Sequence, residues 1–366
     1  MSPEGEKGLD KKPEGDAPRI RVLIVDDSAV ARDLLERGLS QDPRIEVVGK
    51  AADVFIARDK IVFLKPDVMT LDVEMPKMDG IEFLRRLMPQ YPIPTVVVSA
   101  VTTEGSRRAL EALDAGALEV VGKPSATSVT ALRDMIADLA EKVVSAARAD
   151  MSKLKIRPRS PRPEKKVSAP KTVTSPGRRL IAIGASTGGT VALHKIIEAL
   201  PDNLPPVVIV QHMPPVFTRM FADSLDRTSA PHVVEAEDGM VLSSGLVAVA
   251  PGDRHLTIRF SNGAYVARLS DEPKVSGHRP SVDVLFHSAA QEAGSDGLGV
   301  LLTGMGRDGA DGLLDLHRRG GRCIAQDEAS SVVWGMPREA WLLGAAERLV
   351  PLDQIAQEIV RLAGKE

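Results

Sequence analysis

Scarce residue types set the first limits on this chain of 366 residues. Aromatic residues make up only 3% of it, which argues against a stacking platform for single-stranded nucleic acid or sugar rings. Its one cysteine, Cys323, excludes an internal disulfide and a thiolate metal cage, and fits a reducing, cytoplasmic setting. The seven histidines form no HxxxH or HxH pair, so no zinc site is expected. No apolar run approaches the ~20 residues that cross a bilayer, so we expect no membrane insertion.

The remaining composition suggests two globular bodies. At roughly 150 residues per domain the length predicts two domains. A content of 43% hydrophobic and 27% charged residues is typical of soluble proteins, and the net charge of −3 indicates no particular partner. Residues 1–18 are polar, rich in Pro and Gly, and lack the apolar core of a signal peptide, so we expect a disordered tail there.

A basic, proline-rich stretch separates the two bodies. Residues 151–179 contain ten Lys or Arg, one Glu and five Pro, a net charge of +9. Such a stretch repels itself and cannot form a packed core. It could be a patch for nucleic acid or an acidic surface, but its lack of aromatics and its place between two patterned regions favour a solvated linker. We therefore expect a helix end and linker over 141–178, and no nucleic-acid partner.

The first body, residues 19–140, alternates short β-branched runs with amphipathic stretches. Ser28–Leu39 and Ile81–Met88 have the spacing of helices, and a longer helix is expected near Ser128–Arg148. Five strand–helix units in a row predict an open, mostly parallel sheet covered on both faces. The five predicted strands are Val22–Val25, Ile45–Val48, Val68–Leu71, Thr95–Val98 and Leu118–Val121.

Carboxylates stand directly after two of these strands. Asp26 and Asp27 follow the first strand, and Asp72 follows the third. The C-terminal ends of parallel strands share one edge of the sheet, where sites form at the switch in strand order. Three carboxylates gathered there would raise one another's pKa unless a hard cation such as Mg²⁺ intervened. Ser99 ends the fourth strand and Lys123 the fifth, which completes a set of groups suited to phosphoryl transfer.

Together these residues resemble the receiver domain of two-component response regulators. The resemblance rests on Asp26-Asp27, the DVEMPKMDG run from Asp72 to Gly80, Ser99 and Lys123-Pro124. Taken singly, Asp27 could be a helix N-cap and the MPKMDG segment a plain turn. The agreement of four separate strand ends favours the receiver interpretation.

The receiver resemblance implies a flavodoxin-like sheet and a phosphorylation site. It implies that Asp72 accepts a phosphoryl group from a histidine kinase, supported by Ser99 and Lys123. It further implies a Mg²⁺ ion held by Asp27, Asp72 and the backbone carbonyl of Glu74, with Asp26 assisting through water. Many receivers carry an aromatic residue three positions before the lysine. Val120 stands there in this chain, so an aromatic rotamer switch does not carry over.

The second body, residues 179–366, also alternates strands with helices. The apolar strand Leu180–Ile183 runs into a glycine-rich turn and then a helical pattern from Val191 to Leu200. The Ser261-Asn262-Gly263 turn between two alternating runs predicts an antiparallel hairpin. The remainder predicts a doubly wound, mostly parallel α/β domain. Further strands are predicted at Val207–Val210, Leu246–Ala250, Leu256–Phe260, Tyr265–Leu269, Val300–Thr303 and Arg322–Ala325.

Gly184-x-Ser186-x-Gly188 has the GxSxG spacing of a nucleophile elbow and lies between a strand and a helix. On its own, this pattern could also be a glycine-rich phosphate loop. A serine becomes a good nucleophile only when a base takes its proton. His212 follows the strand Val207–Val210 at the same sheet edge, and Asp308 follows the strand ending at Thr303. These three positions fit a nucleophile, a base and an orienting acid.

Other polar residues have weaker claims to this site. Asp283 is a rival for the acid. His194 is expected to be structural, whereas His255 and His287 could line the cleft. Cys323 lies within an apolar strand and is expected to belong to the core. The chain order Ser…His…Asp differs from the Ser…Asp…His order of α/β-hydrolases, so the GxSxG spacing does not assign that fold.

Five motifs stand out in the second body: GASTGG, QHMPPVFT, RPSVDVLFHSAA, LLTGMGRDG and IAQDEASSVVWGMP. With them, the second body resembles the CheB family of chemotaxis protein-glutamate methylesterases, and the receiver–linker–esterase order is that of the family. The resemblance implies that Ser186, His212 and Asp308 form a catalytic triad. It also implies that Met305 contributes a backbone N–H to the oxyanion hole and that Thr187 helps to position His212.

The activity implied by this family resemblance is the hydrolysis of glutamate γ-methyl esters on methyl-accepting chemotaxis receptors, with release of methanol. Deamidation of receptor glutamines is implied as a second activity. A chemotaxis histidine kinase would be the phosphodonor, and no cofactor is expected in the esterase. We expect a cytoplasmic monomer in which the unphosphorylated receiver packs over the triad and blocks access to it.

Three other functions are compatible with parts of this sequence. The leading alternative is a receiver-controlled serine hydrolase that acts on a small-molecule ester, which the triad by itself does not exclude. A transcription regulator would fit the basic linker, but the second body has no helix-turn-helix pattern. A phosphorylation-controlled scaffold without catalytic activity is disfavoured by the complete set of Ser, His and Asp.

Overall fold

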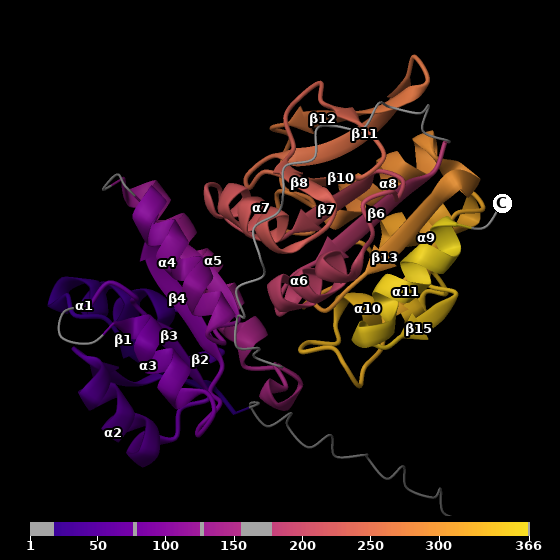
Figure 1. Ribbon diagram of the computed structural model, residues 1–366. Helices are drawn as coiled ribbons and strands as arrows, with labels where there is room; N and C mark the ends of the chain where they lie inside the picture. The colour runs from indigo at the N-terminus through magenta and orange to yellow at the C-terminus, as the bar shows by residue number, and fades with distance from the viewer. Residues whose placement is uncertain (1–17, 76–78, 125–127, 155–177, 365–366) are drawn as a thin grey trace, which may run out of the picture.

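The computed structural model describes residues 18–75, 79–124, 128–154 and 178–364. The expected tail, most of the basic linker and the Pro76–Met78 part of the acidic motif lie outside the described residues. Within the described residues, the chain forms two α/β modules, and η1 (Met151–Lys153) follows the last helix of the first module (Figure 1).

The first module is a five-stranded parallel sheet with the order β2-β1-β3-β4-β5. This confirms the flavodoxin-like arrangement, with its switch in strand order between β1 and β3. The strands are β1 (Ile20–Val25), β2 (Ile45–Ala51), β3 (Val68–Leu71), β4 (Thr95–Ala100) and β5 (Glu119–Lys123). The helices are α1 (Ala29–Leu39), α2 (Val54–Leu64), α3 (Gly80–Leu87), α4 (Thr103–Asp114) and α5 (Val129–Ala146).

Polar caps explain where these helices begin. A side-chain oxygen just before each helix accepts a hydrogen bond from a backbone N–H of the first turn, which would otherwise lack a partner. The cap of α1 is Ser28 rather than Asp27, so the carboxylate of Asp27 is left for the acidic cluster at the sheet edge. The capping residues are Ser28, Asp53, Asp79, Thr102 and Ser128.

The second module is built on a seven-stranded parallel sheet with the order β15-β14-β13-β6-β7-β10-β8, beside a three-stranded antiparallel sheet, β11-β12-β9. The predicted hairpin is formed by β11 and β12. The parallel strands are β6 (Leu180–Ala185), β7 (Val207–Gln211), β8 (His232–Glu235), β10 (Leu246–Val249), β13 (Gly297–Leu301), β14 (Arg322–Gln326) and β15 (Arg348–Val350). The antiparallel strands are β9 (Val241–Leu242), β11 (His255–Ser261) and β12 (Ala264–Ser270).

Alternating side chains on the central strands supply two cores, one on each face of this sheet. In β6, Ile181 and Ile183 enter one core, while Leu180 and Ala182 enter the other, as the period of two in a strand requires. Helices α6, α7 and α11 pack on the first face; α8, α9 and α10, with the hairpin, pack on the second. These helices are α6 (Gly189–Ala199), α7 (Phe217–Thr228), α8 (Val282–Glu292), α9 (Ala310–Arg318), α10 (Met336–Leu342) and α11 (Leu352–Ala363).

Strand order brings three chain segments to one edge of the second sheet. Strand β6 lies between β7 and β13, with which it pairs in parallel. The loops that follow these three strands therefore meet at the same carboxyl edge. Because the chain moves to opposite sides of β6 to form β7 and β13, this edge is also the switch point at which α/β proteins place their sites.

Strand β13 begins earlier than the sequence predicts, and the edge strands β8 and β15 are not predicted from the sequence, each for a local physical reason. The run Val300–Thr303 was expected to be a strand, but β13 starts earlier, at Gly297. The glycines that open it hide the strand pattern. A Cβ on Gly299 would lie 2.4 Å from Cδ1 of Leu313, so a larger residue there would displace that side chain. The edge strands β8 and β15 span only four and three residues, too short to show a pattern.

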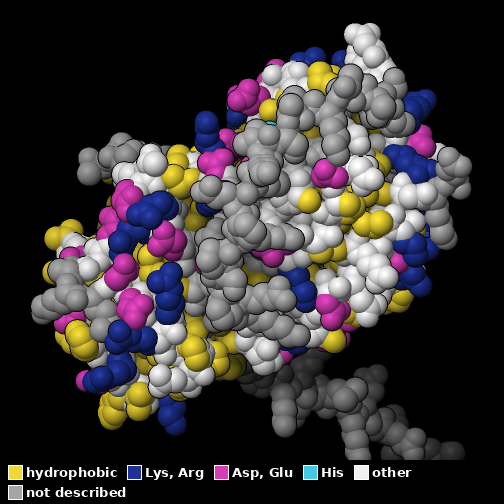
Figure 2. Space-filling model, viewed as in Figure 1, with side chains coloured by type: hydrophobic (Ala, Val, Ile, Leu, Met, Phe, Trp, Pro, Cys, Tyr) yellow, Lys and Arg dark blue, Asp and Glu magenta, His cyan; other side chains and the backbone are white. Residues whose placement is uncertain are grey.

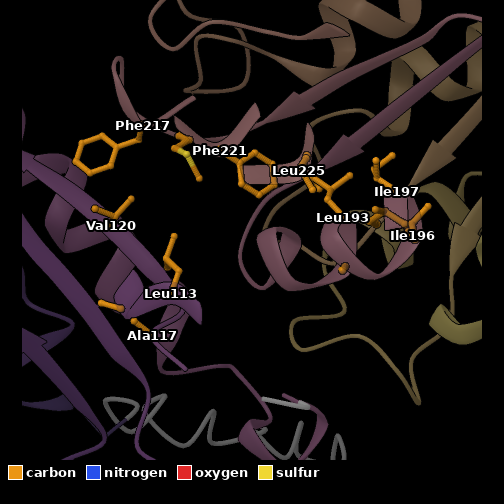
Figure 3. Packing of buried hydrophobic residues seen from close by; sticks show 14 of the residues in the cluster. Leu113, Ala117, Val120, Leu193, Ile196, Ile197, Phe217, Phe221 and Leu225 are labelled. Atoms are coloured by element: carbon orange, nitrogen blue, oxygen red, sulfur yellow. The ribbon is translucent and has the colours of Figure 1, made fainter. Parts of the chain in front are cut away.

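The two modules pack against each other through α4, β5 and α5 of the first and α6 and α7 of the second. Phe217 of α7 is fully buried and lies beside Val120 of β5, and Phe221 lies near Leu113 of α4 (Figure 3). The same apolar cluster runs through both modules. After α5, the backbone N–H of Asp150 donates to the carbonyl of Val332 at 2.9 Å.

The surface of the first module carries charges of both signs. On the face shown in Figure 2, its Lys and Arg side chains lie interspersed with Asp and Glu. Pairs such as Arg107 with Glu104 and Glu111 are solvent-exposed. Each exposed pair contributes at most about 1 kcal/mol, so the stability of the fold rests on the buried clusters instead.

Candidate active site and phosphoacceptor site

A sharp turn after β6 presents Ser186 at the carboxyl edge of the second sheet. The backbone N–H of Ser186 donates to the carbonyl of Thr303 at 3.0 Å, which ties the turn to the loop after β13. Gly188 has a φ of 75°, a left-handed conformation that favours glycine. A Cβ on Gly189 would lie 2.2 Å from Oε1 of Gln211, so only glycine permits this approach of α6 to β7.

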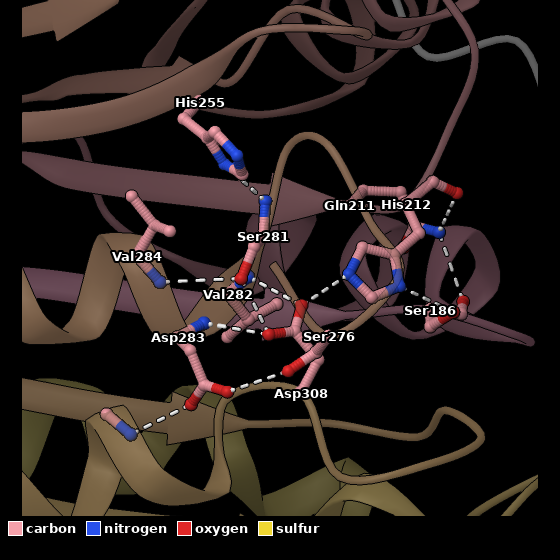
Figure 4. Close-up of polar contacts among 11 residues, drawn as sticks. Ser186, Gln211, His212, His255, Ser276, Ser281, Val282, Asp283, Val284 and Asp308 are labelled. Atoms are coloured by element: carbon pink, nitrogen blue, oxygen red, sulfur yellow. Dashed lines mark hydrogen bonds and ion pairs between the residues drawn. The ribbon is translucent and has the colours of Figure 1, made fainter. Parts of the chain in front are cut away.

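Ser186, His212 and Asp308 meet at this edge, as the sequence predicts. Nδ1 of His212 lies 3.1 Å from Oγ of Ser186, and Nε2 lies 2.8 Å from Oδ2 of Asp308 (Figure 4). All three side chains are buried. With Asp308 ionised, Nε2 carries the ring proton and donates a hydrogen bond to the carboxylate. The lone pair on Nδ1 is then free to take the proton of the serine hydroxyl.

The start of α8 keeps Asp308 charged. Its carboxylate accepts hydrogen bonds from Oγ of Ser281 at 2.7 Å and from the backbone N–H groups of Val282 at 2.7 Å and Asp283 at 3.1 Å. Burial alone would raise the pKa of Asp308, but the hydrogen bonds from His212, Ser281 and Val282 hold that pKa well below its usual range. Asp308 therefore stays an anion that can stabilise an imidazolium.

The rival acid, Asp283, is directed elsewhere. Its carboxylate accepts from the backbone N–H of Gly312 at 2.8 Å and from the hydroxyl of Ser276 at 3.3 Å. Burial, together with the nearby charge of Asp308, raises its pKa to about 6. Asp283 thus ties α8 to α9 and leaves the imidazole of His212 to Asp308.

The other candidate side chains have structural surroundings. His194 packs edge-on against Phe221 with ring centroids 5.5 Å apart. His255 accepts from the backbone N–H of Ser281 at Nδ1, and His287 pairs with Asp315 on the exposed side of α8. Cys323 is buried in β14, where burial raises its pKa to about 12, as expected for a core residue.

The acidic cluster of the first module also forms as predicted. Asp26, Asp27 and Asp72 each place a carboxylate oxygen within 4.8 Å of the others. Nζ of Lys123 lies 2.9 Å from Asp26 and 2.5 Å from Asp72. Burial disfavours the charged form of Lys123, but the neighbouring carboxylates of Asp72, which has the larger effect, and Asp26 raise its pKa. Burial raises the pKa of Asp26. Ser99 is buried beside this cluster and donates to the carbonyl of Gly105.

This acidic cluster can hold a divalent cation. Three carboxylates with only one lysine between them form a donor set of hard oxygens, which Mg²⁺ prefers. The backbone N–H of Glu74 donates to Oδ1 of Asp72 at 2.9 Å, and Glu74 is exposed. The backbone of Glu74 therefore lies next to the candidate phosphoacceptor.

Sequence comparisons match both modules to known families. Residues 181–359 match the CheB methylesterase family, and residues 22–137 match the response regulator receiver domain. A protein-glutamate methylesterase/protein-glutamine glutaminase of Syntrophotalea carbinolica is 49% identical over 344 residues, covering 94% of this chain and 98% of that protein. A second relative, the protein-glutamate methylesterase/protein-glutamine glutaminase 4 of Anaeromyxobacter dehalogenans, is 50% identical, and the match covers 96% of this chain and 98% of that protein.

The chain belongs to the CheB methylesterase family. A solved structure, the CheB methylesterase catalytic domain of Thermotoga maritima, is 42% identical and covers 50% of this chain and 98% of that one, with a TM-score of 0.49. In the part of this CheB chain that the structure describes, none of the helices combines the length and apolar character needed to cross a bilayer.

The loop after β13 brings Gly304, the residue before Met305, next to the candidate nucleophile. The carbonyl of Gly304 accepts from the N–H groups of Gly335 and Met336, which fixes the loop. A Cβ on Gly304 would lie 2.7 Å from Cβ of Ser186, so the backbone must approach the serine closely. The position of Gly304 beside Ser186 is compatible with the predicted role of the Met305 N–H in an oxyanion hole.

Thr187 has different partners from those expected. Its hydroxyl donates to Oε1 of Glu119 at 2.5 Å and accepts from Oγ of Ser145, 2.6 Å away, so both of its partners belong to the receiver. The residue expected to position His212 is thus engaged at the interface between the modules. This contact depends on how the two modules dock, so the motifs of neither module predict it.

Sequence reasoning also missed His278. Its imidazole stacks on that of His212, with centroids 3.8 Å apart and planes 12° apart. The only hint in the sequence is its place just before the RPSVD motif, from which Ser281, Val282 and Asp283 donate hydrogen bonds to Asp308.

Proposed function

We propose that this CheB family member hydrolyses glutamate γ-methyl esters on methyl-accepting chemotaxis receptors, deamidates receptor glutamines, and is controlled by phosphorylation of Asp72. The observation that carries the proposal is the buried relay from Ser186 through His212 to Asp308, with contacts of 3.1 and 2.8 Å. The names of the close relatives support the choice of substrate. In this proposal the enzyme is a cytoplasmic monomer, a chemotaxis histidine kinase is its phosphodonor, and the esterase needs no cofactor.

The proposed reaction begins when Oγ of Ser186 attacks the ester carbonyl carbon while Nδ1 of His212 takes its proton. The tetrahedral oxyanion accepts a hydrogen bond from the N–H of Met305, and Asp308 stabilises the imidazolium. His212 then returns the proton to the departing methoxide, which leaves as methanol. Water, activated by the same imidazole, attacks the acyl-enzyme and releases glutamate and free Ser186.

The same steps serve a glutamine side chain. The amide passes through an equivalent tetrahedral intermediate, and the leaving group is ammonia instead of methanol. Ammonia is the poorer leaving group, so proton donation by His212 carries more weight for the amide. Both substrates give the same acyl-enzyme and therefore the same glutamate product.

In the receiver, a carboxylate oxygen of Asp72 would attack the phosphorus of the kinase phosphohistidine, and the histidine would leave. Asp27, Asp72 and the Glu74 carbonyl would hold Mg²⁺, with Asp26 assisting through water, and the bound ion would supply positive charge for the phosphoryl oxygens. Lys123 and Ser99 would contact the same oxygens. The ion pair of Lys123 with Asp72 would then be replaced by a contact with the phosphoryl group.

Occlusion by the receiver explains how phosphorylation would control the esterase. The receiver residues Glu119 and Ser145 contact Thr187, the residue after the candidate nucleophile. Phosphorylation would loosen this packing. A coupling of about 1–3 kcal/mol between the two sites would change activity 5- to 150-fold. Removing residues 1–150 should therefore raise the basal activity; equal or lower activity than the intact unphosphorylated chain would refute occlusion.

The deciding assay measures methanol release from tritium-methylated receptor membranes, with and without a small phosphodonor. We expect release from the native chain, more with the phosphodonor, and none from the Ser186→Ala variant. Native-like turnover by this variant would mean that another residue is the nucleophile. Hydrolysis of free esters without hydrolysis of methylated receptor would favour the small-molecule alternative.

A further inference from the structure

The catalytic imidazole is held at three places, of which the triad accounts for two. Ser186 and Asp308 contact the two nitrogens of His212, which fixes the edge of the ring. These two contacts do not prevent the ring from tilting out of the plane of the hydrogen bonds. His278 covers one face, with ring centroids 3.8 Å apart and an interplanar angle of 12°. A near-parallel ring at this distance restricts tilting out of the plane of the hydrogen bonds.

A tight turn holds His278 in place. Val275 and His278 exchange backbone hydrogen bonds of 3.1 and 2.9 Å across it. The two residues between them have left-handed backbones, with φ of 52° at Ser276 and 82° at Gly277, as the common two-residue hairpin turn requires. The next residue, Arg279, donates to Asp253 at 2.7 and 2.9 Å. The stacked ring is therefore mounted on a fixed segment.

The same segment supports the acid. Ser281, Val282 and Asp283 donate three hydrogen bonds to Asp308, only a few residues after the ring that covers His212. One stretch of chain, residues 275–283, thus contacts both the base and the acid of the candidate triad. We propose that His278 is a positioning residue of the reaction: its flat ring fixes the plane in which His212 moves the proton between Ser186 and the leaving group.

The charge state of His278 suits this role. Burial and the neighbouring His212 lower its pKa to about 3, and the other charged groups that face it are Asp308, Lys274 and Lys142 of the receiver. His278 is thus neutral at physiological pH. A neutral ring face can lie against His212 when that imidazole becomes a cation, whereas a second cation would repel it.

Three substitutions of His278 separate a flat positioning ring from simple filling of space. They are made in the full chain, activated by a small phosphodonor and assayed for methanol release from tritium-methylated receptor membranes. We expect His278→Ala to lower kcat about 10- to 100-fold with little change in KM, because a small misplacement of the base costs this much. His278→Phe keeps a flat ring and should stay within about threefold of native. His278→Leu fills the volume without a flat face and should resemble the alanine variant.

Controls and a second readout make the outcome decisive. His232→Ala removes a histidine whose side chain is 68% exposed and should leave both kcat and KM unchanged. Melting temperatures of all variants are measured. If the His278→Ala variant does not fold, the kcat values of the His278→Phe and His278→Leu variants decide whether a flat ring is needed. Equal activities of the Phe and Leu variants, or native activity of a folded Ala variant, would overturn the proposal.

This inference rests on the proposed function, so the two need separate tests. The rate at which a fluorophosphonate modifies Ser186 depends on the activation of the serine by His212 and requires no receptor. We expect this labelling rate, too, to be higher for the native chain and the His278→Phe variant than for the His278→Leu and His278→Ala variants. If the native chain reacts with the fluorophosphonate but releases no methanol from receptors, the proposed substrate fails while the role of His278 is still decided by the labelling rates.

Discussion

The hydroxyl of Thr187 donates a hydrogen bond of 2.5 Å to Oε1 of Glu119, and this single contact joins the residue after the candidate nucleophile to the last strand of the receiver. Both side chains are buried. Ser145 of α5 contacts the same hydroxyl, so Thr187 is held from two receiver elements at once. Strand β5 also carries Lys123, which contacts the proposed phosphoacceptor Asp72, and this gives a short structural path between the two sites.

Ser145→Ala should raise the activity of the unphosphorylated chain. The substitution removes one hydrogen bond between the modules, which contributes about 1 kcal/mol, or roughly a fivefold change in an equilibrium. We expect a severalfold rise in methanol release without phosphodonor and no change once the receiver is phosphorylated. Ser40→Ala, on the exposed end of α1, is the control. Unchanged basal release from a stably folded Ser145 variant would show that this contact does not hold the modules together.

The docking of the receiver should weaken as the pH rises. Burial raises the pKa of Glu119, although Lys142 and Thr187 act to lower it. A raised pKa means that the docked state favours the neutral acid, so its stabilisation is full below the usual glutamate range and is lost as pH rises through the raised pKa. The ratio of unphosphorylated to phosphorylated activity should therefore increase with pH.

Glu119→Gln is the matched variant for this pH dependence. The amide oxygen can still accept from Thr187 but does not titrate, so the activity ratio of the variant should stay flat over the same pH range. Taking the ratio cancels the titration of the triad, which is common to both forms. A native-like slope in the glutamine variant would assign the dependence to another group.

The strand ends explain why the candidate site could be predicted from sequence. Ser186, His212 and Asp308 each follow an apolar run, and parallel strands deliver such positions to one edge. His278 follows no strand of this sheet and comes from a turn, so neither periodicity nor spacing marks it. The contact of Thr187 with Glu119 depends on how two separately patterned modules dock, and such a contact leaves no local pattern in either.

Asp72→Asn should abolish phosphorylation and leave the esterase chemistry intact. Asparagine keeps the size of the side chain but lacks the nucleophilic carboxylate. We expect no incorporation of label from a radioactive small phosphodonor, while the fluorophosphonate still modifies Ser186 at the unphosphorylated rate. Asp59→Asn, at an exposed position of α2, should label normally. Persistent labelling of the Asp72 variant would show that another residue is the acceptor.

Chelation should act on the receiver alone. The carboxylates of Asp26, Asp27 and Asp72 form the proposed Mg²⁺ site, whereas the proposed esterase reaction uses only protein groups. Removing divalent ions with EDTA should therefore prevent incorporation of label and its activating effect, without changing basal methanol release. Adding Mg²⁺ back should restore both. A loss of basal release on chelation would argue that the esterase itself needs a metal ion.

Exchanging the two neighbouring acids for their amides should distinguish their roles. Asp308→Asn keeps the shape of the site but no longer favours the Nε2-protonated imidazole, and the equivalent change in a serine protease triad lowers kcat by about 10⁴-fold. Asp283→Asn alters a carboxylate that contacts Gly312 and Ser276 instead of His212, so we expect a loss below about tenfold. Both variants are compared by kcat, fluorophosphonate labelling and melting temperature. A severe loss in the Asp283 variant with a mild one in the Asp308 variant would mean that the acid of the triad had been assigned to the wrong residue.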